Sequence, residues 1–155
     1  MGGSDFMKIA IATDHNGTEI KKEIKNYLKS KDFEVIDLSE HNSTIDDYPE
    51  YAFKVGECVA SKKADLGILL CGTGIGMSIA ANKVKGVRCA HVTNTSEAVL
   101  SRAHNNANII ALGVNNKVND IIKMVDLFIN TSFKSEERHV RRINLITKYE
   151  EDNND

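Results

Sequence analysis

The sequence predicts a single α/β domain in which a five-stranded parallel sheet has helices on both faces and is followed by a C-terminal helix. Three observations support this fold class. The 155 residues suit one domain with a complete hydrophobic core. Short apolar β runs alternate with amphipathic helical stretches, and strict alternation is typical of parallel sheets. No internal repeat or low-complexity linker divides the sequence.

The predicted strands are short runs rich in Ile, Val, Leu and Ala. They cover residues 8–14, 33–38, 65–71, 87–92 and 108–114. In the stretches between them apolar residues recur at three- and four-residue intervals, which predicts helices. Pro49 near a first helical position, and Asn94 with Glu97 three residues later, mark two helix starts. Two further helices are predicted near 117–131 and 135–149.

The two ends of the chain lie outside this pattern. Residues 1–6 lack the apolar core of a signal peptide and precede a second methionine, Met7. We interpret them as a cloning remnant or a short disordered extension. Residues 150–155 are charged and carry no apolar side chain, so we expect a frayed acidic tail there. The folded domain is therefore expected to span residues 7–149.

The charge balance and the cysteines argue against several functions. Twenty basic residues against 22 acidic ones give a net charge of −2, and without a basic stripe nucleic acid is not the expected partner. No apolar run approaches the roughly 20 residues that a membrane span needs. Cys58, Cys71 and Cys89 are odd in number and widely spaced. This favours a reducing compartment, the cytoplasm, over a disulfide framework.

The ends of two predicted strands give the first functional signal. In a Rossmann-like three-layer fold, ligands bind beyond the carboxyl ends of the strands, where the strand order reverses. With the order 2-1-3-4-5, the first and third strands are neighbours at that point. Their ends carry Asp14-His15 and Cys71-Gly72-Thr73.

The loop that follows Cys71, GTGIG at 72–76, leaves backbone N–H groups without side-chain cover and suits an anion. Three familiar interpretations fail on spacing. A dinucleotide fingerprint needs its third glycine at the position of Met77. A cysteine phosphatase loop needs an arginine at that same position, and a P-loop needs a lysine that this loop lacks. For the loop alone, the stronger interpretation is close strand–helix packing beside an inert cysteine.

Other polar residues strengthen the functional interpretation. Arg138 and Arg142 share one face of a predicted helix and suit a phosphate, although such a pair is more often a solvated basic face. His104 and Asn105 end the fourth helix, where we expect a β/α fold to present side chains to ligands; the alternative is a C-cap histidine. His41 and His91 are interpreted as structural. Together these groups describe a metal-free, cofactor-free site for a phosphorylated, hydroxyl-rich small molecule.

At this point the chain resembles the type B ribose-5-phosphate isomerases. The segments ATDHNG, DDYPEYA, CGTGIGMSIAANK, SRAHNNANIIALG and RHVRR are similar to that family's motifs in order and spacing, from Met7 to about Tyr149. Related members act on galactose 6-phosphate or allose 6-phosphate, so the sugar stays open. Some members use a glutamate at the position of Met77 as base. With Cys71 and without that glutamate, this sequence resembles the cysteine type.

The resemblance implies aldose–ketose isomerisation through a cis-enediolate, with Cys71 as base. A helix N-terminus and exposed amides favour a thiolate. Thr73 would assist at the O1/O2 pair, and the amides of 72–76 would stabilise the oxyanion. His104 would open the sugar ring. The resemblance further implies three groups of substrate-binding residues. Sugar hydroxyls would be oriented by Tyr48, Asn105 and Asp14, of which Asp14 also counts as catalytic. The phosphate would be held by His15, Arg138 and Arg142, and further contacts would come from the loop and helix residues Gly72, Gly74, Ile75, Gly76 and Ser78.

The resemblance also implies a homodimer in which His104 and Asn105 reach the partner's Cys71 loop, and it leaves open whether dimers pair into tetramers. One residue departs from the family pattern: many members carry a phosphate-binding arginine where Asn115 stands, and Lys117 lies nearby. Two alternatives remain, a hexose-6-phosphate isomerase and a non-catalytic phosphosugar- or nucleotide-binding module. The thiol favours an enzyme, because binding alone does not need it.

Overall fold

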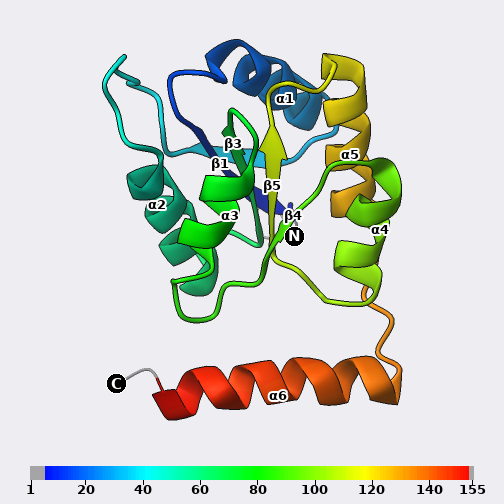
Figure 1. Ribbon diagram of the computed structural model, residues 1–155. Helices are drawn as coiled ribbons and strands as arrows, with labels where there is room; N and C mark the ends of the chain where they lie inside the picture. The colour runs from blue at the N-terminus through cyan, green and yellow to red at the C-terminus, as the bar shows by residue number, and fades with distance from the viewer. Residues whose placement is uncertain (1–5, 154–155) are drawn as a thin grey trace.

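A computed structural model describes residues 6–153 of the chain and confirms the predicted fold class. Five parallel strands form one sheet (Figure 1): β1 (Lys8–Thr13), β2 (Glu34–Asp37), β3 (Leu66–Cys71), β4 (Cys89–His91) and β5 (Ile109–Gly113). Each strand lies within the range that its apolar run predicts and is one to three residues shorter than that range.

The strand order is β2-β1-β3-β5-β4, so the predicted order 2-1-3-4-5 is wrong at one edge. All five residues of β5 are buried, whereas the three residues of β4 are only half-buried. A strand that is apolar on both faces belongs in the middle of a parallel sheet, which places β5 beside β3 and leaves β4 at the edge. The predicted neighbours β1 and β3 are adjacent, as expected.

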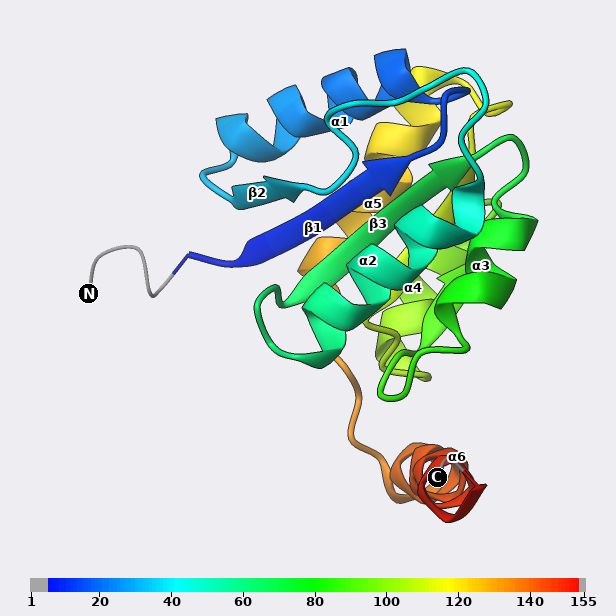
Figure 2. The ribbon, with the colours of Figure 1, turned by 90° about the vertical axis from the view of Figure 1, so that its left-hand side faces the viewer.

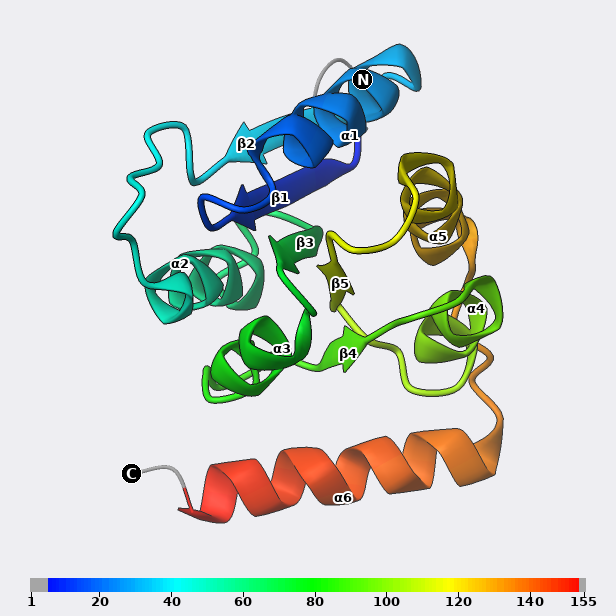
Figure 3. The same ribbon diagram turned by 45° about the horizontal axis from the view of Figure 1, so that its top comes forward.

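Six helices accompany the sheet in the described residues: α1 (Thr18–Ser30), α2 (Tyr48–Ala60), α3 (Ile75–Ala81), α4 (Thr95–Ala103), α5 (Val118–Asn130) and α6 (Glu137–Asn153). Helices α2 and α3 cover one face, and α1, α4 and α5 cover the other (Figure 3). Local signals account for two of the helix starts. Pro49 stands in the first turn of α2, and the Asn94 side chain accepts a hydrogen bond from the Glu97 amide at 2.8 Å to cap α4.

Apolar layers lie on both sides of the sheet because successive strand residues point to opposite faces. Ile9 and Ile11 of β1 pack toward α1 and α5, where Phe128 is fully buried. Ala10 and Ala12 face α2 and α3 in a layer that also contains Cys71 and Met77. Each fully buried Ile, Leu or Phe side chain contributes roughly 2 kcal/mol to folding. The same alternation directs the Cys71 thiol toward the α2–α3 face.

Helix α6 lies apart from the other layers, across the amino ends of the strands (Figures 1 and 2). Its Glu150 carboxylate accepts a hydrogen bond from the Gly86 amide at 3.1 Å. Leu145, Ile146 and Tyr149 are 62%, 56% and 72% exposed, so α6 carries an apolar surface that the other described residues do not cover. None of the helices within residues 6–153 is long and apolar enough to cross a membrane.

The C-terminal end of α6 differs from the predicted boundary of the domain at residue 149. It continues through Asn153, so residues 150–153, expected to belong to a frayed tail, are helical. Residues 154 and 155 lie outside the described residues, as do residues 1–5 of the predicted N-terminal extension. Phe6, the last residue of that extension, is half-exposed.

Candidate active site

The carboxyl ends of β1 and β3 bring Asp14 beside Cys71. Thr13 is in register with Leu70, and the Asp14 amide donates to the Leu70 carbonyl at 3.4 Å. The Asp14 carboxylate is buried and accepts hydrogen bonds from the backbone and side-chain nitrogens of Asn16 at 3.0 and 3.2 Å. Pairing of parallel strands thus creates the neighbourhood that the sequence predicts at this edge.

The glycine loop folds back over the Cys71 side chain. Gly74 has φ +85°, and its amide donates a hydrogen bond to the Cys71 sulfur at 3.2 Å. A side chain at this position would be strained, because its Cβ would also stand 2.9 Å from the Leu112 carbonyl carbon. The Ile75 amide is occupied as well, since it donates to Thr73 Oγ1 at 3.2 Å.

Three amides of the loop are left for a ligand. Those of Gly72, Thr73 and Gly76 find no acceptor among residues 6–153, so the expectation of free N–H groups from 72 to 76 holds for these and not for Gly74 or Ile75. Thr73 Oγ1 accepts from a backbone amide, which leaves its own proton available as a donor. The loop therefore offers backbone donors, a hydroxyl and a thiol within a few residues.

Two aromatic side chains border the loop. The Tyr48 ring lies against Gly76 so closely that a Cβ there would stand 2.5 Å from its Cζ. On the other side, His91 Nε2 is 2.8 Å from the Thr73 carbonyl oxygen. Sequence reasoning treated His91 as structural without a partner. Its position at the end of a predicted strand, like that of Asp14 and Cys71, is the signal that could have drawn attention to it.

His15 is held by a residue that sequence reasoning missed. Its Nδ1 lies 2.8 Å from Asp46 Oδ1, and this hydrogen bond is the main reason that the pKa of His15 is raised. Burial alone would raise the pKa of Asp46. Hydrogen bonds from His15, Asn42 and Tyr51 outweigh that effect and hold the pKa well below its usual range.

We call Asp14, His15, Tyr48 and residues 71–76 the carboxyl-edge cluster.

The other predicted residues lie at the opposite edge of the sheet. We call His104, Asn105, Arg138 and Arg142 the amino-edge cluster. Helix α4 starts just after the carboxyl end of β4 and runs back, so its end at His104 precedes the first residue of β5. Cys71 is level with Gly113, the last residue of β5. Gly113 lies roughly 13 Å further along the strand than Ile109, the first residue of β5. The expectation that the end of the fourth helix faces the ligand edge is therefore wrong within one chain.

The amino-edge cluster has its own internal order. The His104 ring stacks on His139 of α6 at 4.4 Å between centroids, and the Lys134 amide donates to the Ala103 carbonyl at 2.9 Å. Burial, with Arg138 and His104 nearby, lowers the pKa of the buried His139 ring. Arg138 pairs with Glu136 at 2.5 Å, and Arg142 is exposed and forms no ion pair within the described chain.

A groove of about 720 Å³ separates α6 from the body of the domain at this edge. Asn105, Arg88, Tyr149 and Glu150 are among its lining residues, and none of the carboxyl-edge cluster is. Among residues 6–153, no group of three or more His, Cys, Asp or Glu side chains is placed to hold a metal ion. The chemical groups at hand are a thiol, backbone amides, carboxylates, imidazoles and guanidinium groups.

The fold is that of a Rossmann-like α/β protein with a thiol, a carboxylate and free amides at the ligand edge of its sheet. Residues 9–146 match the family described as Ribose/Galactose Isomerase, and the chain belongs to that family of isomerases.

Related proteins extend over almost the whole chain. Ribose-5-phosphate isomerase B of Escherichia coli is 40% identical over 148 residues, which cover 95% of this chain and 99% of that protein. A solved structure of the Clostridium thermocellum ribose-5-phosphate isomerase B has a TM-score of 0.90 at 44% identity, covering 94% of this chain and 99% of the other. The Mycoplasma genitalium enzyme with bound ribulose 5-phosphate has a TM-score of 0.89 at 44% identity, covering 94% and 97%.

Proposed function

We propose that this protein interconverts ribose 5-phosphate and ribulose 5-phosphate through a cis-enediolate, with Cys71 as the base. The observation that carries the proposal is the Cys71 sulfur beneath the Gly74 amide, beside Asp14 and the free amides of the loop. The related enzyme with ribulose 5-phosphate bound supports the choice of substrate. The isomerase domain begins at Met7 in this proposal, and residues 1–6 take no part.

The reaction needs a base that moves one proton between neighbouring carbons. The Cys71 thiolate removes the proton from C2 of the open-chain aldose, and the electrons form a C1–C2 double bond as the carbonyl oxygen becomes an enediolate oxygen. The amides of Gly72, Thr73 and Gly76 stabilise that oxygen, and preorganised donors of this kind supply several kcal/mol. The Thr73 hydroxyl helps to move the hydroxyl proton between O2 and O1. Cys71 then returns its proton to C1.

The two clusters form one site if two subunits assemble. His104 and the Cys71 loop lie at opposite edges of the sheet, so a side chain of His104 cannot reach the thiol of its own chain. In a two-fold dimer, the amino-edge cluster of one subunit completes the carboxyl-edge cluster of the other, twice. The uncovered apolar surface of α6 is suited to bury itself in that contact.

In this shared site, His104 of the partner subunit opens the sugar ring and its Asn105 binds sugar hydroxyls together with Asp14 and Tyr48. The phosphate lies between His15 and the partner's Arg138 and Arg142. Phosphate binding far from the reacting carbons then positions C1 and C2 at the thiol. Because the chemistry requires reduced Cys71, we also infer that the protein works in a reducing compartment, the cytoplasm.

Deuterium exchange tests the chemistry directly. Ribose 5-phosphate incubated with the protein in deuterated water should gain deuterium at C2, and the ribulose 5-phosphate formed should carry it at C1. The Cys71→Ala variant under the same conditions is the matched control. Tight binding of the sugar phosphate without exchange would instead indicate a binding module.

The family also contains isomerases of other sugars, as its description states. A comparison of kcat/KM for ribose 5-phosphate, allose 6-phosphate and galactose 6-phosphate separates the alternatives. We expect ribose 5-phosphate to be preferred. A higher value for either hexose phosphate would assign the protein to the six-carbon branch while leaving the enediolate chemistry in place.

A further inference from the structure

Asp46 joins His15 to a rigid part of the fold. The Asp46 side chain is 8% exposed, whereas that of His15 is 39% exposed. The imidazole Nδ1 is 2.8 Å from Asp46 Oδ1, and the His15 amide donates to the same oxygen at 3.3 Å. A buried carboxylate therefore holds both the ring and the backbone of a residue that is open to solvent at the carboxyl edge.

The second carboxylate oxygen is fully engaged as well. Asp46 Oδ2 accepts hydrogen bonds from Tyr51 Oη at 2.9 Å, from Asn42 Nδ2 at 3.0 Å and from the Ser43 amide at 3.3 Å. Asn42 Nδ2 also donates to the Thr13 carbonyl at 2.9 Å, which ties the loop to the end of β1. With both oxygens occupied, the carboxylate cannot rotate away from His15.

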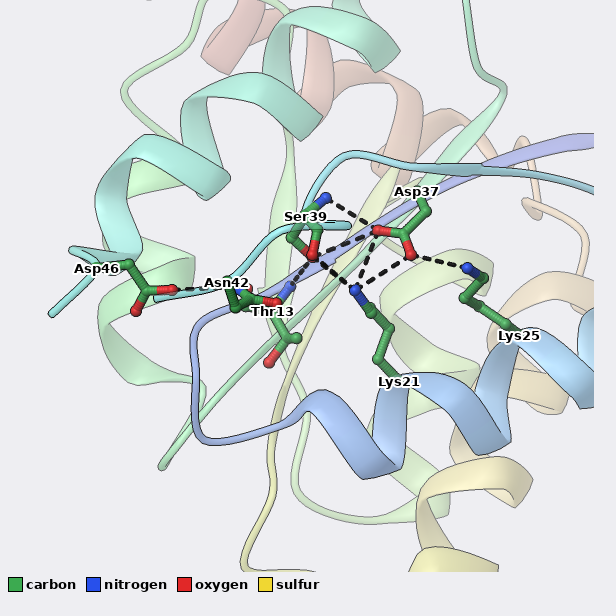
Figure 4. A network of polar contacts seen from close by, with 7 residues as sticks. All are labelled: Thr13, Lys21, Lys25, Asp37, Ser39, Asn42 and Asp46. Carbon is green, nitrogen blue, oxygen red and sulfur yellow. Dashed lines mark hydrogen bonds and ion pairs between the residues drawn. The ribbon is translucent and has the colours of Figure 1, made fainter. Parts of the chain in front are cut away.

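The network continues into the body of the domain (Figure 4). The Thr13 amide donates to Ser39 Oγ at 3.0 Å, and the Lys21 ammonium donates to the Ser39 carbonyl at 2.8 Å. Lys21 and Lys25 both pair with the buried Asp37 carboxylate, at 3.1 and 2.8 Å. The loop that carries Asp46 is thus anchored to β1, to the end of β2 and to α1.

This arrangement determines which nitrogen of His15 faces a ligand. A carboxylate can only accept, so Nδ1 must carry a proton and donate it. Nε2 makes no hydrogen bond within the described chain and is the nitrogen left for a ligand. On an imidazolium, that nitrogen is a charged N–H donor, which suits a phosphate oxygen.

We propose that Asp46 is the positioning residue of His15: it orients the imidazole through Nδ1 and keeps it as an imidazolium whose Nε2–H binds the substrate phosphate. This inference rests on the proposed function, in which His15 contacts the phosphate. Asp46, which lies outside the predicted site, thereby controls the pH dependence of phosphate binding.

The charges around His15 make such control necessary. Asp46, through its hydrogen bond and its charge, and Asp14 through its charge, raise the pKa of His15, and partial burial opposes them. In the proposed shared site, Arg138 and Arg142 of the partner subunit would lower the pKa of the same imidazole. Without the Asp46 carboxylate, His15 beside two guanidinium groups would lose its proton near neutral pH.

The decisive variant is Asp46→Asn, which retains the shape and removes the charge. We expect KM for ribose 5-phosphate to rise about tenfold at pH 8, the effect of losing a charge-assisted hydrogen bond, with kcat changed less than about twofold. The ratio of variant to wild-type KM should fall toward one near pH 5.5, where the imidazole is protonated in both proteins. Titration of the substrate phosphate cancels in that ratio.

Three comparisons separate positioning from simple stability. Asp46→Glu should restore part of the affinity, and Asp46→Asn should add nothing in a His15→Asn background. Glu40→Gln removes an exposed carboxylate from the same loop and should leave KM unchanged. A KM ratio that stays constant from pH 5.5 to 8, with a lowered Tm, would overturn the proposal and make Asp46 structural.

A second measurement does not depend on turnover. Nitrogen-15 NMR of the imidazole in the intact protein should show Nδ1 protonated and a lower pKa of His15 in Asp46→Asn, and inorganic phosphate should bind the variant more weakly at pH 8 than at pH 5.5. The role of Asp46 would be refuted if His15 titrated identically in wild type and Asp46→Asn. Equal phosphate affinity of the variant at pH 8 and pH 5.5 would refute it as well. A wild-type protein that passes this measurement but does not isomerise ribose 5-phosphate would contradict the proposed function alone.

Discussion

The Gly74 amide donates a hydrogen bond to the Cys71 sulfur at 3.2 Å, across a turn in which Gly74 has φ +85°. The left-handed conformation of Gly74 directs this amide back to the end of β3 rather than into α3. This hydrogen bond fixes the position of the sulfur beneath the loop. The glycine loop therefore orients the Cys71 side chain as well as offering free amides to an anion.

Replacement of Cys71 should separate chemistry from binding. We expect Cys71→Ala to lower kcat about 1,000-fold, a magnitude typical of losing a catalytic base, while substrate affinity changes little. Cys58→Ala, at a partly buried position of α2, is the matched control and should stay active. Steady-state kinetics and calorimetric binding measure the two effects. Parallel loss of binding and activity would mean that Cys71 is structural.

Gly74→Ala should damage the site through the backbone. The left-handed conformation costs a non-glycine residue about 1 kcal/mol, and the added Cβ would meet the Leu112 backbone at 2.9 Å. We expect a loss of stability of about 2 kcal/mol together with reduced kcat, since the amide on the Cys71 sulfur must shift. Gly72→Ala is the control for stability alone, because its Cβ would meet no protein atom within 4 Å. Urea unfolding of both variants and the kcat of Gly74→Ala test this, and equal stability of the two variants would refute it.

The buried Asp37 should make stability depend on acid pH. Burial alone would raise its pKa, but hydrogen bonds from Lys25, the Ser39 amide and Lys21 lower it overall. A lowered pKa in the folded state means that the carboxylate stabilises the fold above its unfolded pKa of about 3.9 and that this contribution disappears as pH falls through the folded value.

We therefore expect Asp37→Asn to lower the free energy of unfolding by about 2 kcal/mol at pH 7, because it leaves the buried Lys21 without its counter-charge. The difference from wild type should shrink below about pH 4. Urea unfolding at pH 7 and pH 3 measures it. Glu34→Gln, which breaks the exposed pair with Lys8, should change stability by less than about 0.5 kcal/mol at either pH. A difference independent of pH would show that the charge of Asp37 is not the cause.

Subunit exchange tests the shared site. Cys71→Ala and His104→Ala, each nearly inactive alone, should recover roughly a quarter of wild-type activity when their subunits mix, because half of the dimers are then mixed and each has one intact site. Native mass spectrometry of the mixture verifies the exchange. If mixed dimers form and no activity returns, both residues act within one chain.

Local patterns predicted the elements well because each is encoded in a short stretch. The apolar runs around Ile11, Leu69 and Ile110 specified strands, and Asn94 with Glu97 specified a helix start that the capping hydrogen bond confirms. Strand order depends on which faces are buried by distant helices. The run of β4 carries Arg88 and His91 whereas that of β5 is apolar, a difference that favours β5 as the inner strand, but the pairing itself is visible only in the assembled sheet.

The sequence alone determined the parallel α/β fold, the meeting of Asp14 with Cys71 at one edge, and the residue types of a sugar-phosphate isomerase, because neighbouring parallel strands must end together. Only the tertiary structure decided how His104 is held at the opposite edge, where its ring stacks on His139, because α6 reaches this edge from a distant part of the chain. It also decided which distant groups hold the site residues. Asp46 lies 31 positions from His15, and His91 lies 18 positions from Thr73, so no local pattern could pair them.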